Sequence, residues 1–180
     1  IALSNNDANL FSSIDDGQNK AVAVKVGWQQ ILIDKKWQLK TNINHEFVAK
    51  NFETIQRWET IEFNRDWNIL TNDATKNYFQ SEISLQNKKN DFVLYRFNNL
   101  NYTSTLENNS FFRARAKAEQ RLKNAWIGTF INFETNSRKD LNTQEFINTS
   151  HRFKEYEGYF GIGDSTNIFA KIGFNYRNND

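Results

Sequence analysis

The stretch SFFRARAKAEQRL, residues 110–122, places a charged side chain at every second position. Guanidinium and ammonium groups in such a row can bind anionic groups or pair with carboxylates on a neighbouring element, for example Glu134. In a strand the charges would share one face, and Phe112, Ala114, Ala116 and Ala118 would form the other. The row consists of Arg113, Arg115, Lys117, Glu119 and Arg121.

The same stretch also suits a helix. Phe111, Ala114, Ala118, Leu122 and Trp126 would then lie on one apolar stripe. Ala, Glu, Gln, Arg, Lys and Leu are all good helix formers. The residues alone leave both structures open, so the neighbouring segments must decide between them.

Alternation of polar and apolar residues recurs along the chain, in residues 21–28, 37–47, 77–87, 125–135 and 168–177. Alternation of this kind is typical of strands that are covered on one face, and short polar breaks between such runs predict antiparallel hairpins. We therefore expect the charged row to be a strand too. The chain is predicted to be all-β and antiparallel, with about eight to ten strands of roughly 10 to 13 residues.

Two regions depart from the simple pattern. In residues 92–104 the apolar positions change parity near Asn98 and Asn99, which predicts a β-bulge. Residues 49–76 are less regular and suggest a loop-rich region. The side chains concentrated there are a candidate loop contact, and they are Arg57, Trp58, Arg65, Asp66 and Trp67.

Composition narrows the function classes. The 180 residues suit one domain, 1–180, and the net charge of +2 gives no reason to expect nucleic acid as a partner. There is no cysteine, and the two histidines, His45 and His151, lie far apart without zinc-site spacing. No phosphate-binding loop, dinucleotide fingerprint or nucleophile elbow is present. We therefore expect neither an enzyme nor a bound cofactor or metal.

Strand length and composition favour a transmembrane β-barrel. Strands that cross a bilayer need roughly 9–11 residues, apolar toward lipid and polar toward the lumen, whereas soluble strands are usually about 5–6 residues long. Aromatic residues make up 15% of the chain although its mean hydropathy is −0.76, and proline is absent. The charged row would then face an aqueous lumen. The aromatic residues expected at the membrane interfaces are Trp28, Trp37, Trp126, Tyr156 and Tyr176.

A soluble protein remains the alternative, because the same alternation suits a sheet with one face on a core. That protein would be a secreted or periplasmic antiparallel β-sandwich or barrel. It would bind glycan or protein through exposed aromatic side chains.

Three segments, NLFSSIDDGQN, RWETIEFNRDWN and NIFAKIGFNYR, resemble segments of large outer-membrane β-barrel proteins of the Bacteroidota. That group includes barrels for protein secretion and gliding motility, and transporter-like barrels. The resemblance implies an outer-membrane location and a structural, transport or secretion role. The implied partners are the lipid bilayer and other outer-membrane or secretion-complex subunits. The absence of methionine and the ending RNND, where such barrels usually end on an aromatic residue, predict a piece of a larger barrel.

Overall fold

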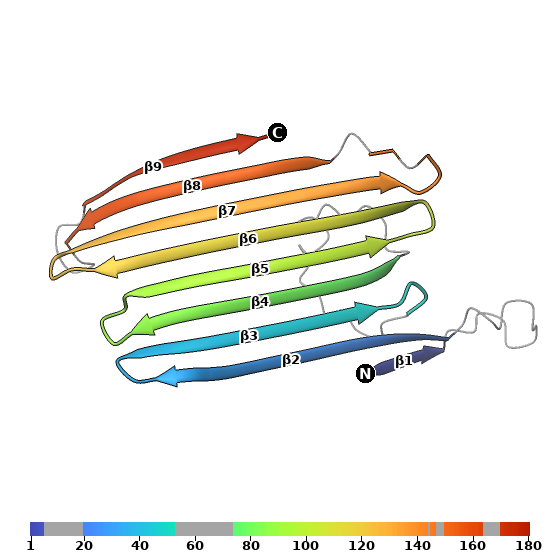
Figure 1. Ribbon diagram of the computed structural model, residues 1–180, viewed down its shortest axis with the longest axis horizontal. Coiled ribbons are helices and arrows are strands. Elements are labelled where there is room, and N and C mark those ends of the chain that lie inside the picture. Colours follow the sequence, from blue (N-terminus) through green and yellow to red (C-terminus); the bar gives the residue numbers. More distant parts are fainter. Residues whose placement is uncertain (6–19, 53–73, 144, 147–149, 164–169) are drawn as a thin grey trace, which may run out of the picture.

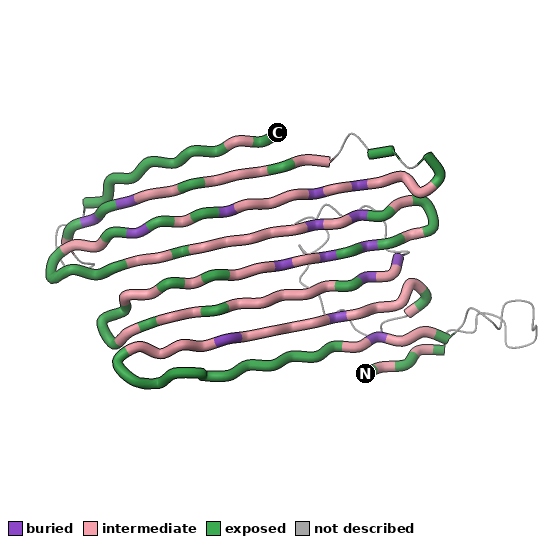
Figure 2. Tube along the Cα trace, viewed as in Figure 1, coloured by how far each residue is buried: buried purple, intermediate pink, exposed green. Residues whose placement is uncertain are grey.

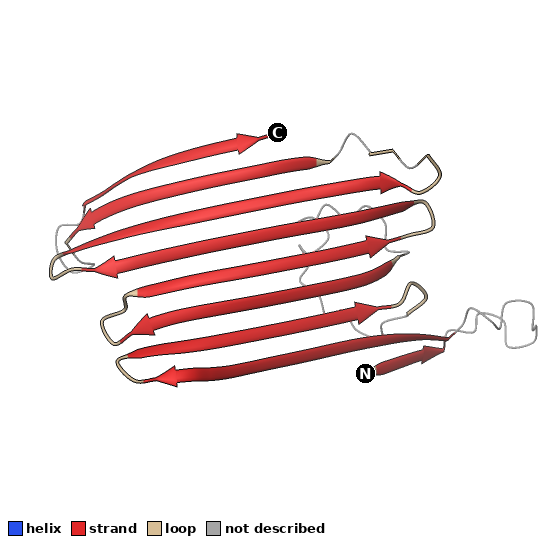
Figure 3. Ribbon diagram, viewed as in Figure 1, coloured by secondary structure: helices blue, strands red, loops and turns tan. Residues whose placement is uncertain are grey.

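The computed structural model describes residues 1–5, 20–52, 74–143, 145–146, 150–163 and 170–180. These residues form nine strands and no helix (Figure 3). Among them there is accordingly no helix that is long and apolar enough to cross a membrane. The predicted all-β, antiparallel fold is confirmed. The strands are β1 (Ala2–Asn5), β2 (Lys20–Asp34), β3 (Trp37–Val48), β4 (Thr75–Asn87), β5 (Phe92–Thr103), β6 (Glu107–Arg121), β7 (Ala125–Asp140), β8 (His151–Ile162) and β9 (Ala170–Asn179).

All nine strands belong to one sheet in which each strand pairs antiparallel with the next along the chain (Figure 1). β1 pairs only with Lys20–Ala23, so the outer edge of β2 from Val24 to Asp34 has no partner among the described residues. The outer edge of β9 is also unpaired there. Both edge regions are largely exposed, as Figure 2 shows in green. The described sheet is therefore open.

The register across the sheet divides the side chains into two faces. Pairing runs without a shift from β3 to β9, and the one irregularity lies between Ile31 and Ile33 of β2. Because paired residues share a face and successive residues alternate, the register assigns each side chain to one side. We call the side that carries Arg113 the charged face and the side that carries Ala114 the apolar face.

The bulge predicted near Asn98 and Asn99 is absent. β5 keeps one register with both neighbours, so Leu100 and Tyr102 lie on the charged face. They are buried there together with Phe111 and Ala74, and Tyr78 packs against the group. The apolar residues of β5 change from one face to the other at this point because the cluster gives Leu100 and Tyr102 apolar contacts on the charged face. The change therefore requires no bulge in the backbone.

The irregular region is shorter than 49–76 at its C-terminal end. β3 ends at Val48, and β4 already begins at Thr75, where Lys76 pairs with Val48. The ammonium group of Lys76 forms an ion pair with Glu46 on the charged face. The candidate loop contact of Arg57, Trp58, Arg65, Asp66 and Trp67 lies outside the described residues.

The two ends of the sheet differ in the length of their connections. At the end drawn on the left in Figure 1, residues 35–36, 88–91 and 122–124 join β2–β3, β4–β5 and β6–β7, and residues 163–169 connect β8 to β9. We call this the short-turn end. At the opposite end, the long-loop end, Ser104–Leu106 is also short, but the other connections span 6–19, 49–74 and 141–150.

Candidate functional site

The charged row of β6 lies on one face, as a strand requires. Glu107–Arg121 is extended throughout and keeps a continuous register with β5 and β7. The helical alternative for residues 110–122 is therefore wrong. The apolar face of this strand carries Phe112 and the three alanines, and the charged face carries Arg113, Arg115, Lys117, Glu119 and Arg121.

Arg113 forms the ion pair with Glu134 that its place in the row suggested. Arg113 Nε donates to Glu134 Oε2 at 2.6 Å across the β6–β7 ladder, and both side chains are mostly buried. His151 Nε2 lies 3.8 Å from the other oxygen, Oε1. Since a charge removed from water must be paired to be tolerated, Glu134 and Arg113 stabilise each other within the wall of the sheet.

Nearby charges on this face also have cross-strand partners. The partner of Lys117 is an aromatic ring and not a polar group: its ammonium group lies 5.3 Å from the centre of the Phe92 ring, in a cation–π contact. Side-chain contacts of this kind link neighbouring strands across the charged face. The other contacts are Arg96 Nε to Glu82 at 2.6 Å, Arg115 Nε to Asn132 at 3.2 Å and Arg177 Nε to Glu155 at 2.7 Å.

Near the short-turn end, Glu119 fixes an aromatic ring over a glycine. Tyr159 donates its hydroxyl hydrogen to Glu119 Oε2 at 2.8 Å, and Arg121 Nε lies 3.3 Å from Oε1. The Tyr159 ring covers Gly128 so closely that a Cβ there would overlap it. Cross-strand aromatic cover of a glycine helps to fix strand register. The same arrangement recurs where Trp126 covers Gly161 and Phe174 covers Gly158.

Replacing Gly128 with alanine is expected to lower the free energy of unfolding by about 1–3 kcal/mol, the usual cost of overpacking. The added methyl group must displace Tyr159, and the hydrogen bond to Glu119 would be lost with it. Urea unfolding monitored by fluorescence would measure the change. Gly27→Ala is the control, because a Cβ at Gly27 meets only the side-chain oxygen of Asn44, at 3.0 Å. Equal effects of the two substitutions would contradict the role of Tyr159.

A buried ionic cluster lies on the charged face toward the long-loop end. Arg138 Nη2 donates to both carboxylate oxygens of Glu107, at 2.7 and 3.0 Å, and its Nε donates to Asn109 Oδ1 at 3.0 Å. Asn109 also donates to Glu107 Oε1 at 3.1 Å. Arg138 is 3% exposed and Asn109 is fully buried. The sequence pattern did not predict this cluster, although Asn136 and Arg138 continue the polar positions of Asn132 and Glu134 beyond residue 135.

The apolar face carries a row of four phenyl rings from four adjacent strands. Phe79, Phe97, Phe112 and Phe133 contact one another edge to face, with ring centres 6.0, 5.2 and 5.8 Å apart. On the long-loop side of this row the same face becomes polar, with residues such as Asn101 and Ser137. The phenyl row therefore marks one border of the apolar band.

The five aromatic residues expected at interfaces occupy different positions along their strands. Trp37 begins β3 on the apolar face, at the short-turn end. Trp126 is also near a strand end, but it lies on the charged face against Gly161. Trp28 and Tyr156 lie near the middle of β2 and β8, and Tyr176 lies three residues before the end of β9. The interfacial role of these residues stays a prediction.

Asp91, in the turn between β4 and β5, connects that hairpin to β6. The backbone N–H of Arg121 donates to its Oδ1 at 2.6 Å and the Asn87 amide donates to its Oδ2 at 2.7 Å. These bonds, the one from Arg121 first, hold the pKa of Asp91 below its ordinary value of 3.8. The stability they contribute is present above that ordinary pKa and is lost as the pH falls through the lowered one.

The geometry of the described residues suits ion pairing and surface contact. No group of three or more His, Cys, Asp or Glu is arranged among them to hold a metal ion. Comparison with known proteins gives no matching family model, no matching curated protein and no matching solved structure.

Proposed function

We propose that the chain is a segment of an outer-membrane β-barrel with a structural, transport or secretion role. Its charged face would line an aqueous lumen and its apolar face would contact lipid. The observation that carries the proposal is the pairing of an exposed apolar face with a charged face on the same long strands. The two unpaired edges, Val24–Asp34 and β9, are where further strands would complete the barrel, because a sheet in lipid must close.

The apolar face exposes many large side chains in the described structure. A soluble monomer rarely exposes a contiguous apolar patch of more than a few hundred Å². Lipid is the environment that accepts such a surface without a covering layer. The exposed side chains on this face include Val26, Trp28, Ile83, Val93, Tyr95, Ile127, Ile131, Tyr156, Phe160, Ile162, Ile172, Phe174 and Tyr176.

The strand lengths and connections support the same proposal. β3 to β8 are 12 to 16 residues long, which exceeds the roughly 9–11 residues needed to cross a bilayer at a tilt. Outer-membrane barrels have short turns on the periplasmic side and longer loops outside. The short-turn end would therefore face the periplasm.

The charged row would serve mainly to stabilise the wall of the barrel. Arg113 and Arg121 are paired with carboxylates, Arg115 with an amide and Lys117 with an aromatic ring. Side chains held in this way keep their charges hydrated or compensated on the lumen side, where charge is tolerated. No reaction is proposed for this surface, and no cofactor.

Cysteine scanning of positions 112 to 121 tests which face meets water and which meets lipid. The chain has no cysteine of its own, so each variant carries a single thiol. In lipid vesicles, water-soluble thiol reagents are expected to label positions 113, 115, 117, 119 and 121. Lipid-soluble reagents are expected to label 112, 114, 116 and 118, because the strand alternates its faces.

The alternative soluble β domain predicts a different result. Its apolar face would lie on a core, so lipid-soluble reagents in the bilayer would label none of positions 112, 114, 116 and 118, and the purified chain would stay monodisperse in buffer without detergent. Either outcome would overturn the membrane proposal. Positions 101 and 108, on the apolar-face side beyond the phenyl row, are the control, since they should meet water in both cases.

A further inference from the structure

The middle of the charged face, over β3 to β6, carries more cations than acids. Two adjacent rows of paired residues cross these four strands there, and Glu82 is the single acid in the two rows. We call the cations of these rows the cationic patch. It consists of Lys40, Arg96, Arg115 and Lys117, and the remaining residues of the rows are Asn42, Ser84 and Leu94.

Two arginines of the patch, Arg96 and Arg115, lie directly opposite each other across the β5–β6 ladder. Like charges in opposite positions destabilise a sheet, whereas an acid opposite an arginine stabilises it, as Glu134 does for Arg113. Stabilisation of the wall therefore does not explain the facing arginines. Departures of this kind from the rules of stability are expected at functional sites.

The two lysines keep their charge at the surface of the charged face. Lys117 is exposed, and the ring of Phe92 that it contacts does not neutralise its ammonium group. Lys40 is half-buried and forms no ion pair within the described part of the chain. Even Arg96, which pairs with Glu82, has a side chain that is 41% exposed. The patch is therefore both positive and accessible to water.

The acids that lie further along the same two rows are already paired. Glu155 and Glu157 are on β8, and each contacts a cation of β9. Arg177 Nε lies 2.7 Å from Glu155, and Lys171 Nζ lies 3.7 Å from Glu157. These carboxylates do not remove the excess of positive charge over β3 to β6.

The patch lies at the depth of the apolar band, on the other side of the same wall. Ala116 stands between Arg115 and Lys117 in β6 and pairs with Tyr95 and Ile131 on the apolar face. Those two side chains are 45% and 40% exposed. Rings of arginine and lysine inside a pore select for anions, and a wall of low dielectric constant strengthens their field.

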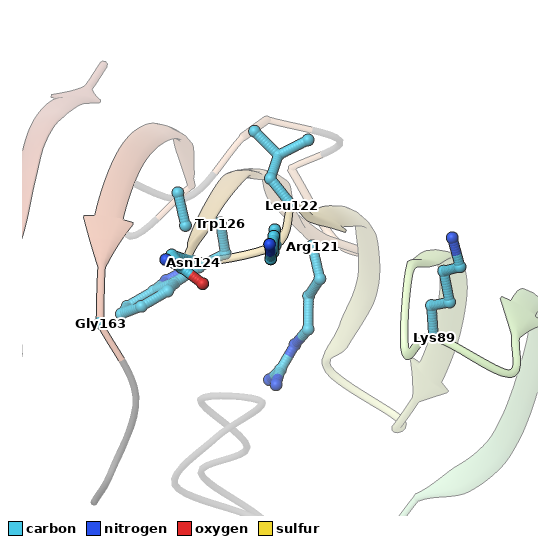
Figure 4. Close-up of a pocket in the computed structure, with 8 residues that line it drawn as sticks. Lys89, Arg121, Leu122, Asn124, Trp126 and Gly163 are labelled. Carbon is cyan, nitrogen blue, oxygen red and sulfur yellow. The ribbon is translucent and has the colours of Figure 1, made fainter. Parts of the chain in front are cut away.

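The charged face is also cationic where it reaches the short-turn end. Arg121 and Trp126 lie on this face and line a cavity of about 490 Å³ at the tip of the β6–β7 hairpin, with Lys89 on the neighbouring turn (Figure 4). Positive charge around an entrance raises the local concentration of anions. The other lysines in the turns of this end are Lys35, Lys36, Lys88 and Lys123.

We propose that the cationic patch makes the lumen selective for small anions, which pass the two lysines and the facing arginines at mid-depth. The inference rests on the proposed function, because only a barrel gives the charged face a lumen. It adds the class of solute to the transport role. Cations of the same size are repelled at this point by the same charges.

Reaction of a single thiol with charged reagents measures the potential at the patch. Ser84 pairs with Lys40 and Leu94 within the rows, and the chain has no cysteine of its own. The probes are the anionic 2-sulfonatoethyl and the cationic 2-(trimethylammonium)ethyl methanethiosulfonates, each rate being divided by the rate with a free thiol. In lipid vesicles, Ser84→Cys should react faster with the anionic reagent.

The charge of the patch is tested by adding Lys40→Gln/Lys117→Gln to the Ser84→Cys chain. The ratio of the anionic to the cationic rate should then fall roughly tenfold at low ionic strength, where the two lysines are least screened. Lys20→Gln/Lys139→Gln is the matched control, because it removes two lysines on the apolar-face side at the long-loop end and should leave the ratio unchanged. A ratio of one in Ser84→Cys, or an equal fall in both double variants, would overturn the inference.

Reversal potentials in planar phosphatidylcholine bilayers test the passage of ions. Under a gradient of potassium chloride, pores formed by the chain should pass chloride more readily than potassium. Lys40→Gln/Lys117→Gln should weaken this preference, and the control pair should keep it. Pores that pass potassium as readily as chloride would contradict the inference. The thiol rates require no current, so they decide the matter also where no conducting pore forms.

The outcomes separate this inference from the proposed function. If Ser84→Cys reacts equally with both reagents while lipid-soluble reagents label positions 112, 114, 116 and 118, the anion selectivity is wrong and the barrel proposal stands. If lipid-soluble reagents label none of these positions, both are overturned.

Discussion

Replacing Arg138 with methionine is expected to lower the free energy of unfolding by about 3–5 kcal/mol, because it leaves a carboxylate without its partner in a mostly buried site. The guanidinium of Arg138 donates to both oxygens of Glu107 and to Asn109. Methionine keeps much of the side-chain volume, so the effect comes from the lost charge and hydrogen bonds. Urea unfolding in detergent or lipid vesicles would measure it.

Arg177→Met is the matched control for this prediction. Arg177 also forms an ion pair at 2.7 Å, with Glu155, but its side chain is 66% exposed. Exposed pairs contribute about 0–1 kcal/mol, so the control should change little. The double variant Arg138→Met/Glu107→Gln should recover part of the loss, since it removes the uncompensated charge. A loss at Arg138 no larger than that at Arg177 would contradict a desolvated ion pair.

Alternation along the chain was enough to predict the sheet and the side on which the charged row lies. It works because strand side chains repeat every two residues, and the predicted face of Arg113 depends on nothing else. The same rule misled where apolar residues occur on the charged face. Leu100 and Tyr102 lie on that face because they pack with Phe111. A contact of this kind cannot be predicted from the alternation of residues along one strand.

Contacts between strands were harder to predict because they depend on register. The phenyl row combines Phe79, Phe97, Phe112 and Phe133 from four strands, and a shift of one residue at any ladder would disperse it. The Arg138 cluster was missed for a related reason. The polar residues after Thr135 resemble a loop by composition, yet β7 continues to Asp140 and places Arg138 opposite Asn109.

A substitution at Ile131, on the apolar face, tests through the free energy of unfolding whether this face meets lipid. This residue lies in the middle of the apolar band, paired with Ala116 and Tyr156, between the phenyl row and Ile127. It is 40% exposed in the described structure. Ile131→Arg is expected to lower the free energy of unfolding by about 2–4 kcal/mol in lipid vesicles, the cost of a cation near the bilayer midplane.

The neighbouring residue supplies the control at the same depth. Phe130 lies on the charged face, paired with Lys117 and Glu157, so an arginine there remains beside water and a carboxylate. Phe130→Arg should therefore cost clearly less than Ile131→Arg. Reversible urea unfolding of both variants in phosphatidylcholine vesicles gives the comparison. On a soluble sheet whose apolar face meets water, arginine at Ile131 would change stability by about 0.5 kcal/mol or less. That result would show that the apolar face does not meet lipid.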